Sequence, residues 1–435
     1  MDSKTGLNWG NTAWMLAATA LVLLMTPGLA FFYGGMVRSK NVLAILMQNF
    51  VCMGIVSVLW VLDLFSLAFG TDKLGGFIGS ASTFVGMHHG ADMWGSGDGV
   101  PTTVIATFQI TFAIITAALI TGAVADRLKF APFVVFVTAW SICVYAPIAH
   151  WVWGGGWLAQ HHVEDFAGGT VVHINAGVAG IALTLVLGKR LGWPTERMRP
   201  HNVPFVLLGA GLLWFGWIGF NAGSELAADP VAGWALINSV VATAAAMLGW
   251  LVVEKIRDGH STTLGAASGL VAGLVAITPA CGFITPIGAI GLGVVAGAVC
   301  ALAVGLKFKA RVDDSLDVFA VHVVGGIVGA LSIGLIGDAT IGGNNGLFNG
   351  GGFTQLGRQA LGVGSVIVYD FIVTLVIALV IDKTMGLRVS RDVELEGLDI
   401  NLHAESAYDT VGSSGSGSSH TSVHLPAATS EKVST

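Results

Sequence analysis

The chain consists of long apolar stretches separated by short polar ones. A helix that crosses a bilayer needs about 20 mainly apolar residues, and about eleven stretches reach that length. The predicted helices cover residues 10–33, 43–70, 101–124, 131–150, 167–188, 203–222, 231–253, 262–280, 284–305, 317–336 and 357–385. The pattern therefore predicts an all-α membrane protein of about eleven transmembrane helices.

The positive charges predict how these helices are oriented. They gather in every second loop, beginning after the first helix, at Arg38, Lys40, Arg127, Lys129, Lys189, Arg190, Arg197, Arg199, Lys255, Arg257, Lys307, Lys309 and Arg311. The loops between carry only Lys73 and Arg358. Because cytoplasmic loops collect Lys and Arg, we expect the N terminus outside, the C terminus inside and an odd number of helices.

The composition excludes an ordinary soluble protein. Hydrophobic residues make up 54% and charged residues 11% of the chain, whereas roughly a quarter of a soluble domain is charged. The opening residues, MDSKTGLNWG, lack the pattern of a signal peptide. We expect a multi-pass protein of the plasma membrane, surrounded by lipid, that does not bind nucleic acid. Nothing indicates a cofactor or a metal site, and the four cysteines form no CxxC pair.

A short motif occurs twice and indicates an internal duplication. The fifth predicted helix contains VVHINAGVAG and the tenth contains AVHVVGGIVG, so both carry H-x-x-x-G-x-x-G, beginning at His173 and at His322. Two units of five helices would have opposite topology, and such inverted repeats place the substrate site at their interface. The pattern predicts an inverted 5+5 repeat plus an eleventh helix. The glycines should let the two helices pack closely, with both imidazoles near a common axis.

Histidine within a membrane helix is costly unless it is paired or lines a cavity. Three interpretations remain open for His173 and His322. Each ring could bond a neighbouring backbone carbonyl, the two could line a transport path, or they could hold a haem in a redox protein. Their equivalent positions in the repeat favour the transport path.

Several segments resemble the ammonium transporter family of Amt, Mep and Rh proteins. They are AHWVWGGGWLAQHHVEDFAGGTVVHINAG at 149–177, WFGWIGFNAGS at 214–224, GLVAITPACGFI at 273–284, RVDDSLDVFAVH at 311–322 and GLRVSRDVELEGLDINLHAESAY at 386–408. The resemblance implies a transporter of ammonium or ammonia, and of methylammonium, with one pore in each subunit of a homotrimer. It also implies that the protein is not an enzyme. Residues 386–409 would form a cytoplasmic regulatory segment that a PII-type protein could contact, and 1–385 the transmembrane domain.

The resemblance also implies roles for individual residues. Trp153, Ser224 and Phe108 would bind the cation in an outer vestibule, which Asp165 supports. Phe112 and Phe220 would form a gate, with His173, His322 and Trp217 in the pore below. These roles are those that the family assigns to the matching positions.

The chemistry of these residue types is consistent with that implication. An aromatic face attracts a desolvated cation by up to about 2 kcal/mol, and a serine oxygen accepts a hydrogen bond from ammonium. A phenyl gate excludes water and raises the cost of passing a bare charge, while neutral imidazoles can accept or relay a proton. For Asp165 an ordinary helix cap is an equally natural interpretation.

Two alternative functions and two further expectations remain. A sensor of ammonium would share these features but would need a separate signalling partner, and a gas channel for neutral ammonia or carbon dioxide is a variant of the transporter. Asp63, a carboxylate inside the second helix, is expected to make a structural contact near the outer surface. Residues 410–435 are rich in Ser, Gly and Thr, which is typical of a disordered tail.

Overall fold

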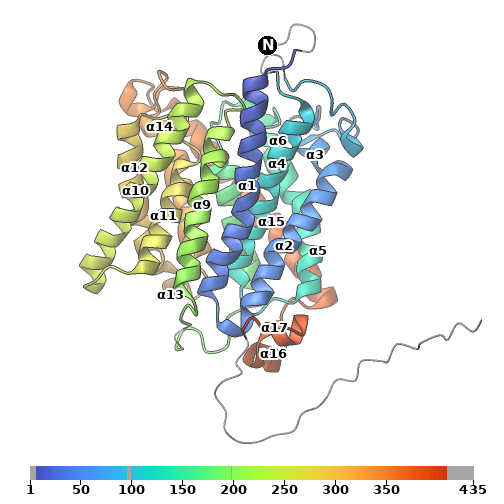
Figure 1. Cartoon of the computed structure of the whole chain (residues 1–435), viewed down its shortest axis with the longest axis vertical. Coiled ribbons are helices and arrows are strands. Elements are labelled where there is room, and N and C mark those ends of the chain that lie inside the picture. The colour runs from blue at the N-terminus through green and yellow to red at the C-terminus, as the bar shows by residue number, and fades with distance from the viewer. Residues whose placement is uncertain (1–5, 96–98, 197, 409–435) are drawn as a thin grey trace, which may run out of the picture.

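The protein is a bundle of long helices that run side by side along the vertical direction of Figure 1. The computed structural model describes residues 6–95, 99–196 and 198–408, and the tail expected at 410–435 lies outside that range. Within it, ten helical segments have at least 18 residues and the apolarity needed to cross a membrane. An eleventh apolar helix, Thr263–Ile277, is shorter. The expectation of about eleven helices in an all-α membrane protein is therefore confirmed.

The spanning segments are formed by the following elements in chain order: α1 (Trp9–Met36); α2 (Val42–Leu59), η2 (Trp60–Leu64) and α3 (Phe65–Phe69); α4 (Thr102–Val124); α5 (Phe130–Trp140), η4 (Ser141–Tyr145) and α6 (Ala146–Val152); η5 (Gly169–Ile174) and α8 (Asn175–Leu187); α9 (Val203–Gly223); α10 (Pro230–Asp258); α11 (Thr263–Ile277); α12 (Pro286–Ala303); η6 (Phe319–Val324) and α14 (Gly325–Ile336); and α15 (Thr354–Met385). The connecting elements are η1 (Ser39–Asn41), β1 (Asp72–Lys73), β2 (Ile78–Gly79), η3 (Val85–Met87), α7 (Trp157–Gln160), α13 (Leu306–Ala310), η7 (Leu347–Asn349), α16 (Arg391–Glu396) and α17 (Leu398–His403). Strands β1 and β2 form a small antiparallel hairpin after α3, with Asp72 opposite Gly79.

The predicted boundaries differ from the observed ones mainly at α10 and α11. Helix α10 continues to Asp258, five residues beyond the predicted end, and stops at Gly259, whose φ of +83° favours glycine. Helix α11 has only 15 residues. Because most of α11 is buried among the other helices, it does not need to match the full thickness of the hydrocarbon.

Four of the spanning segments contain a π-helical turn, namely η2, η4, η5 and η6. A π turn closes i→i+5 hydrogen bonds and adds one residue to an α-helix, and such turns are frequent at functional sites. His173 lies in η5 and His322 lies in η6. The two copies of the repeated motif therefore share an irregular backbone as well as a sequence.

The two motif helices pack closely and reciprocally. A Cβ atom placed on Gly177 would lie 2.4 Å from Val323 Cγ2 and 3.5 Å from the Cβ of His322. A Cβ placed on Gly326 would lie 2.8 Å from Ile174 Cγ1 and 3.5 Å from the Cβ of His173. Each glycine thus makes room for the segment that carries the opposite histidine, so the predicted close packing of the two helices is confirmed.

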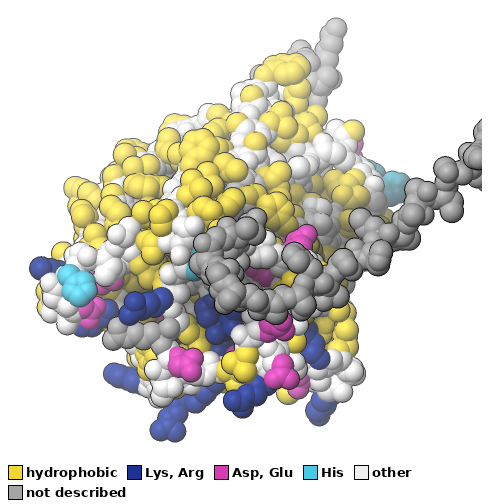
Figure 2. Space-filling view, turned by 60° about the horizontal axis from the view of Figure 1, so that its bottom comes forward, with side chains coloured by type: hydrophobic (Ala, Val, Ile, Leu, Met, Phe, Trp, Pro, Cys, Tyr) yellow, Lys and Arg dark blue, Asp and Glu magenta, His cyan; other side chains and the backbone are white. Residues whose placement is uncertain are grey.

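The start of α1 and the last described helices, α16 and α17, lie at opposite ends of the bundle. Figure 1 shows the beginning of α1 at the top and helices α16 and α17 at the bottom, as an odd number of crossings requires. Figure 2 shows Lys and Arg side chains gathered toward the lower end, below a flank that is mainly hydrophobic. The charges and the apolar flank are therefore separated as in a protein that spans a membrane.

At the charged end, the loops are held together by buried ion pairs. Arg190 donates from Nη2 to Asp313 Oδ1 at 2.7 Å and also lies 3.6 Å from Asp126 Oδ2. Burial alone would raise the pKa of Asp313, but the Arg190 guanidinium holds that pKa below its ordinary value. Arg127 is completely buried and donates to backbone carbonyls, including that of Asp313. These contacts join the loops after the third, fifth and ninth spans.

The segment 386–408 is bound to the same loops. Val389 N donates to Arg127 O at 3.0 Å, and the Asp399 carboxylate accepts from Leu43 N and Ala44 N at 3.0 and 2.8 Å. Glu394 accepts from Leu191 N at 2.6 Å. The segment is therefore an ordered part of the charged face, in contact with the loops that follow the first, third and fifth spans.

Candidate functional site

A cavity opens at the end of the bundle opposite α16 and α17. It has a volume of about 250 Å³ and is lined by Phe69, Trp94, Ile105, Gln109, Val152, Trp153, Phe166, Ser224 and Leu226. Trp153 and Ser224 were both predicted to share an outer vestibule. Aromatic faces and a few polar groups make up the wall, which is a chemistry that suits a small cation.

Trp153 and Ser224 are both positioned by backbone carbonyls. Trp153 is the C-cap of α6, and its indole Nε1 donates to Asp165 O at 2.9 Å. Ser224 is the C-cap of α9, and its hydroxyl donates to Phe220 O at 2.7 Å. Since the hydroxyl hydrogen is used within the helix, the Ser224 oxygen presents lone pairs as an acceptor.

Asp165 stabilises the start of the fifth span. Its carboxylate accepts from the backbone N–H groups of Gly168, Gly169 and Thr170 at 2.8, 2.6 and 2.7 Å. The Thr170 hydroxyl and Val171 N also donate to it. These are the orphan donors at the N-terminus of a helix, and Gly168 before them has a φ of +118°. The predicted cap is present, and it acts on the π-helix η5 that carries His173.

Two phenyl rings separate this cavity from the interior. Phe112 and Phe220 are both completely buried, with ring centroids 4.2 Å apart, and Phe112 lies edge-on to Trp153 at 5.8 Å. Phe108 is buried as well and contacts Phe112 at 4.8 Å. It is Gln109, the next residue, that lines the outer cavity. Phe108 therefore supports the phenyl pair from the side.

A second, very small cavity lies on the inner side of Phe220. Its volume is about 10 Å³, close to the least that holds one water molecule. The wall contains His173, His322, Trp217 and Phe220 together with apolar side chains, namely Met25, Leu29, Ile115, Leu119, Val172, Leu213 and Val271. The space is therefore narrow and apolar apart from the two imidazoles.

The two histidines form a buried pair. His173 Nδ1 and His322 Nδ1 are 3.3 Å apart, and the side chains are about 1% and 3% exposed. Trp217 stacks on His173 with ring centroids 5.4 Å apart and donates from Nε1 to Thr278 Oγ1 at 2.8 Å. His173 Nε2 is buried and has no hydrogen-bond partner among the described residues. An unused buried polar atom beside a cavity is a candidate contact for a small polar solute.

The geometry of the pair constrains its protonation. A hydrogen bond between two Nδ1 atoms needs one proton, so in a neutral pair one ring is protonated at Nδ1 and the other at Nε2. The two rings then differ, because one exposes an Nε2 acceptor and the other an Nε2–H donor. The pair can therefore both accept a proton from a solute and donate one to it.

The haem interpretation does not fit this geometry. A haem iron ligated by two imidazoles lies between them, with the porphyrin in the same gap, whereas these Nδ1 atoms are 3.3 Å apart. The adjoining cavity of about 10 Å³ is far too small for a porphyrin. Elsewhere in the described chain, no group of three His, Cys, Asp or Glu side chains could hold a metal ion.

Sequence reasoning did not select Trp94, Gln109 or Leu226, which also line the outer cavity. Gln109 is the most informative of these, because its Oε1 is buried without a hydrogen-bond partner in the described structure. A glutamine one residue after Phe108 in a membrane helix was a signal that could have been used. Trp94 and Leu226 lie in loops, and only the folded chain brings them to the cavity. Asp63 lies in η2 and lines neither cavity, and its Oδ1 is buried without a hydrogen-bond partner among the described residues.

Known proteins resemble this chain over nearly its whole length. Residues 13–408 match the Ammonium Transporter Family. An ammonium transporter of Mycobacterium tuberculosis (strain ATCC 25618 / H37Rv) is 54% identical over 438 residues, which cover 94% of this chain and 92% of that protein. The ammonium transporter of Bacillus subtilis (strain 168) is 45% identical over 407 residues, which cover 92% of this chain and 99% of that protein.

Solved structures are similar along nearly the whole chain. The crystal structure of Saccharomyces cerevisiae Mep2 superposes with a TM-score of 0.83 at 34% identity, covering 90% of each chain. A structure described as a sensor Amt protein gives 0.85 at 30% identity, covering 92% of this chain and 99% of the other. The family consists of membrane transporters and not of enzymes. This chain belongs to the ammonium transporter family.

Proposed function

We propose that each subunit moves ammonium through the two cavities described above, with Trp153 and Ser224 as the recruiting site. The Trp153 face attracts the cation, and the Ser224 oxygen accepts a hydrogen bond from one of the N–H groups of ammonium. A potassium ion carries no N–H donor, so the acceptor favours ammonium.

The observation that carries this proposal is the order of the three layers. A polar aromatic cavity of about 250 Å³, a phenyl pair 4.2 Å apart and a cavity of about 10 Å³ beside two histidines follow one another. A charged ion would enter the inner space without its water, which is costly in a low dielectric. Transfer of one proton from ammonium to His173 Nε2, on the inner side of the phenyl pair, removes that cost and leaves neutral ammonia beside the imidazoles.

The histidine pair can either receive the released proton or accept a hydrogen bond from neutral ammonia. An unbonded Nε2 on His173 can accept from ammonia or receive a proton. The Nδ1–Nδ1 contact of 3.3 Å lets the proton pass from one ring to the other. In this proposal Trp217 fixes the His173 ring through stacking, and Phe108 supports the gate.

The larger assembly is part of the same proposal. In this proposal α16 and α17 lie in the cytoplasm and the aromatic cavity opens to the outside of a plasma membrane, an orientation that the Lys- and Arg-rich loops support. The subunits form homotrimers with one pore each. The segment 386–408, which contacts three of these loops, serves as the regulatory element and as the surface on which a PII-type protein could act.

Transport current and ammonium uptake in proteoliposomes test the conduction path. We expect an ammonium-dependent current in the wild type that His173→Ala alters or abolishes, and a weaker apparent affinity in Trp153→Ala. Potassium in place of ammonium controls for leak, and size-exclusion elution controls for folding. Folded wild type that shows neither current nor uptake would contradict the proposal.

A second candidate function is sensing. One similar structure is described as a sensor Amt protein, and the ordered segment 386–408 offers a surface for a signalling partner. Cells that carry a pore-blocked variant distinguish the two functions. Signalling that survives the block would favour a sensor, and signalling that is lost with uptake would favour transport alone.

A further inference from the structure

Two buried glutamines of α15 line neither of the cavities described above. Gln355 and Gln359 lie four residues apart in the first two turns of the helix, and each is about 1% exposed. A polar side chain inside a membrane protein is costly unless its donors and acceptors are used. Each amide carries two N–H donors and an oxygen with two lone pairs. The partners of these groups therefore show which parts of the chain the two side chains hold together.

Gln359 binds both backbone groups of Glu164. Its Oε1 accepts from Glu164 N at 2.8 Å, and its Nε2 donates to Glu164 O at 2.6 Å. The side-chain amide thus exchanges two hydrogen bonds with this residue, as the facing residue of an antiparallel strand would. Nε2 also donates to Ala330 O of α14 at 3.1 Å. Gln359 therefore joins α15 to the segment before η5 and to the helix that continues from His322.

Gln355 completes this set of hydrogen bonds. Its Nε2 donates to His162 O at 3.2 Å and to Gln359 Oε1 at 3.1 Å, while its Oε1 accepts from Arg358 Nη1 at 3.2 Å. Both hydrogens on each amide nitrogen are used, and so are both lone pairs of Gln359 Oε1. These bonds fix the backbone of residues 162–164 against the start of α15.

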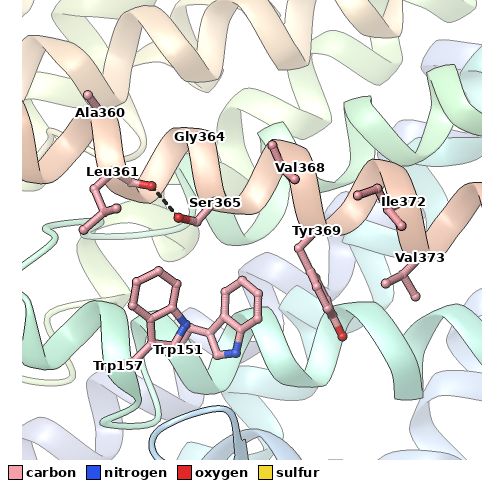
Figure 3. Close-up of a pocket in the computed structure, with 10 residues that line it drawn as sticks. All are labelled: Trp151, Trp157, Ala360, Leu361, Gly364, Ser365, Val368, Tyr369, Ile372 and Val373. Atoms are coloured by element: carbon pink, nitrogen blue, oxygen red, sulfur yellow. Dashed lines mark hydrogen bonds between the residues drawn. The ribbon is translucent and has the colours of Figure 1, made fainter.

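The packing brings the same elements together. A Cβ atom placed on Gly362 would lie 2.6 Å from Val163 Cγ1, so this glycine lets α15 approach the segment one turn after Gln359. The face of α15 drawn in Figure 3 is different, because it lines an apolar groove. There the Ser365 hydroxyl donates to Leu361 O of the same helix at 2.7 Å. The link to the outer segment belongs to the buried glutamine face.

The residue after Glu164 is Asp165, which contacts both parts of the site. Its backbone oxygen accepts from Trp153 Nε1, and its carboxylate accepts from the first N–H groups of η5, which carries His173. The Glu164 oxygen and the Asp165 nitrogen belong to one planar peptide unit. A bond that holds this oxygen therefore also holds the start of Asp165. Gln359 can thus act on the outer site without touching it.

We propose that Gln359 is a positioning residue for the recruitment of ammonium, with Gln355 as its support. It acts through Asp165, whose carbonyl fixes the Trp153 indole, and it touches no solute. Through Ala330 it also keeps this segment in place relative to the helix that follows the second histidine. The inference rests on the recruiting role proposed above for Trp153.

Three variants of the full-length protein test this role. Gln359→Met keeps the length of the side chain and removes its donors and its acceptor. Asn49→Leu is the control for loss of a buried amide, because Asn49 is also completely buried and donates to Ile45 O and Thr121 Oγ1 but lines neither cavity. Ser365→Ala is the control for a change on the other face of α15.

Hydrogen–deuterium exchange measures the segment directly and does not depend on transport. In Gln359→Met the amides of residues 164–171 should exchange about tenfold faster than in the wild type, because Glu164 N loses its acceptor and the neighbouring Asp165 cap is loosened. In Asn49→Leu and Ser365→Ala these amides should exchange at the wild-type rate. Wild-type exchange in Gln359→Met would overturn the proposal.

Uptake of labelled methylammonium into proteoliposomes measures the effect on recruitment. The apparent KM should rise roughly fivefold in Gln359→Met, because a displaced indole loses part of its attraction for the cation. Vmax should stay close to the wild-type value, and both controls should keep the wild-type KM. Since Gln359 acts through the indole, adding Gln359→Met to Trp153→Ala should not raise KM further.

The outcomes separate this inference from the proposed function. A further rise of KM in the double variant would overturn the inference. So would an unchanged KM in Gln359→Met beside a raised KM in Trp153→Ala. An unchanged KM in Trp153→Ala itself would refute the recruiting role, and the inference would fall with it.

Gln355→Met is a milder variant, in case Gln359→Met does not fold. It removes the donors to His162 O and Gln359 Oε1 and leaves both bonds between Gln359 and Glu164. Exchange of residues 164–171 and the KM should both increase, by smaller factors than in Gln359→Met. A wild-type KM and wild-type exchange in Gln355→Met would contradict its supporting role. A larger effect in Gln355→Met than in Gln359→Met would overturn the assignment to Gln359.

Discussion

The Trp153 indole donates a hydrogen bond of 2.9 Å to the backbone carbonyl of Asp165. The side chain of the same aspartate accepts from the first N–H groups of the helix that carries His173. One residue therefore holds the outer aromatic ring with its backbone and the histidine helix with its carboxylate. This connection helps to fix the position of the outer site relative to the inner pair.

Replacing Trp153 by Leu should weaken recruitment without unfolding the protein. The indole face is expected to contribute up to about 2 kcal/mol of cation–π attraction, so the apparent KM for ammonium should rise by as much as roughly 30-fold. Uptake of labelled methylammonium with ammonium as competitor measures the change. Trp234→Leu is the matched control, because Trp234 is 39% exposed on α10 and lines neither cavity. Equal KM values in the two variants would refute the role of Trp153.

Replacing Asp313 by Asn should destabilise the charged end of the bundle. The change leaves Arg190 buried with only the more distant Asp126 carboxylate, and breaking one partner of a buried pair costs about 3–5 kcal/mol. Thermal unfolding in detergent measures the loss, with Asp338→Asn, at a half-exposed loop position without an ion pair in the described structure, as control. The double variant Arg190→Met with Asp313→Leu should recover part of the stability, since no unpaired charge remains. A double variant less stable than Asp313→Asn would be evidence against this explanation.

Ionisation of Asp314 should lower the free energy of unfolding as the pH rises from about 4 to about 6. Burial, and then the nearby Asp317 carboxylate, raise its pKa from 3.8 to about 6. The folded protein therefore binds a proton over that range that the unfolded chain releases, and ionisation costs roughly 3 kcal/mol above it. Asp314→Asn should raise the melting temperature at pH 7.5 and leave it unchanged at pH 4, while the Asn oxygen can still accept from Phe319 N.

Asp313, the neighbouring carboxylate, is a control whose effect on stability should change with pH in the opposite direction. The pKa of Asp313 lies below its ordinary value, so its contribution to stability is present at neutral pH and is lost as the pH falls. Melting temperatures of both variants across pH 4 to 8 distinguish the two effects. The same pH dependence in both variants would show that the assignment of the shifts is wrong.

Replacing Asp399 by Ala should release the segment 386–408. The carboxylate accepts from Leu43 N and Ala44 N. The loss of both bonds leaves one buried and one part-buried donor without an acceptor, and a buried unsatisfied donor costs about 1–3 kcal/mol. Limited proteolysis should then cut within 386–408 faster than in the wild type. Asp392→Ala, on an exposed face of α16, should keep the wild-type rate.

Hydropathy alone was sufficient to predict the helices, because a bilayer demands a minimum apolar length that most loops here do not reach. The histidine pairing was also predictable, since the shared glycine spacing required two helices to approach at equivalent positions. The four π turns were not predictable, because one added residue leaves hydropathy and composition unchanged. The short length of α11 was not predictable either. Its 15 residues suffice for a helix of the bundle only because neighbouring helices surround it.

The outer cavity was predicted in part. Trp153 and Ser224 line it, as expected, whereas Phe108 lies behind the phenyl pair and Gln109 takes its place on the wall. A helix places consecutive residues about 100° apart, so a small rotation decides which of the two faces the cavity. Trp94 and Leu226 come from loops whose paths depend on tertiary contacts. Sequence periodicity carries no information about such paths.

The π turns at His173 and His322 make the register of the histidines adjustable. Each turn holds one residue more than an α-helix would, so removing that residue could restore regular α geometry without breaking the segment. Because the widened turn absorbs the extra residue locally, the α-helical parts on its two sides would keep their relative orientation. In these helices a single-residue deletion at the π turn therefore removes the local widening around the imidazole, whereas the same deletion elsewhere in the span would rotate one part by about 100° against the other.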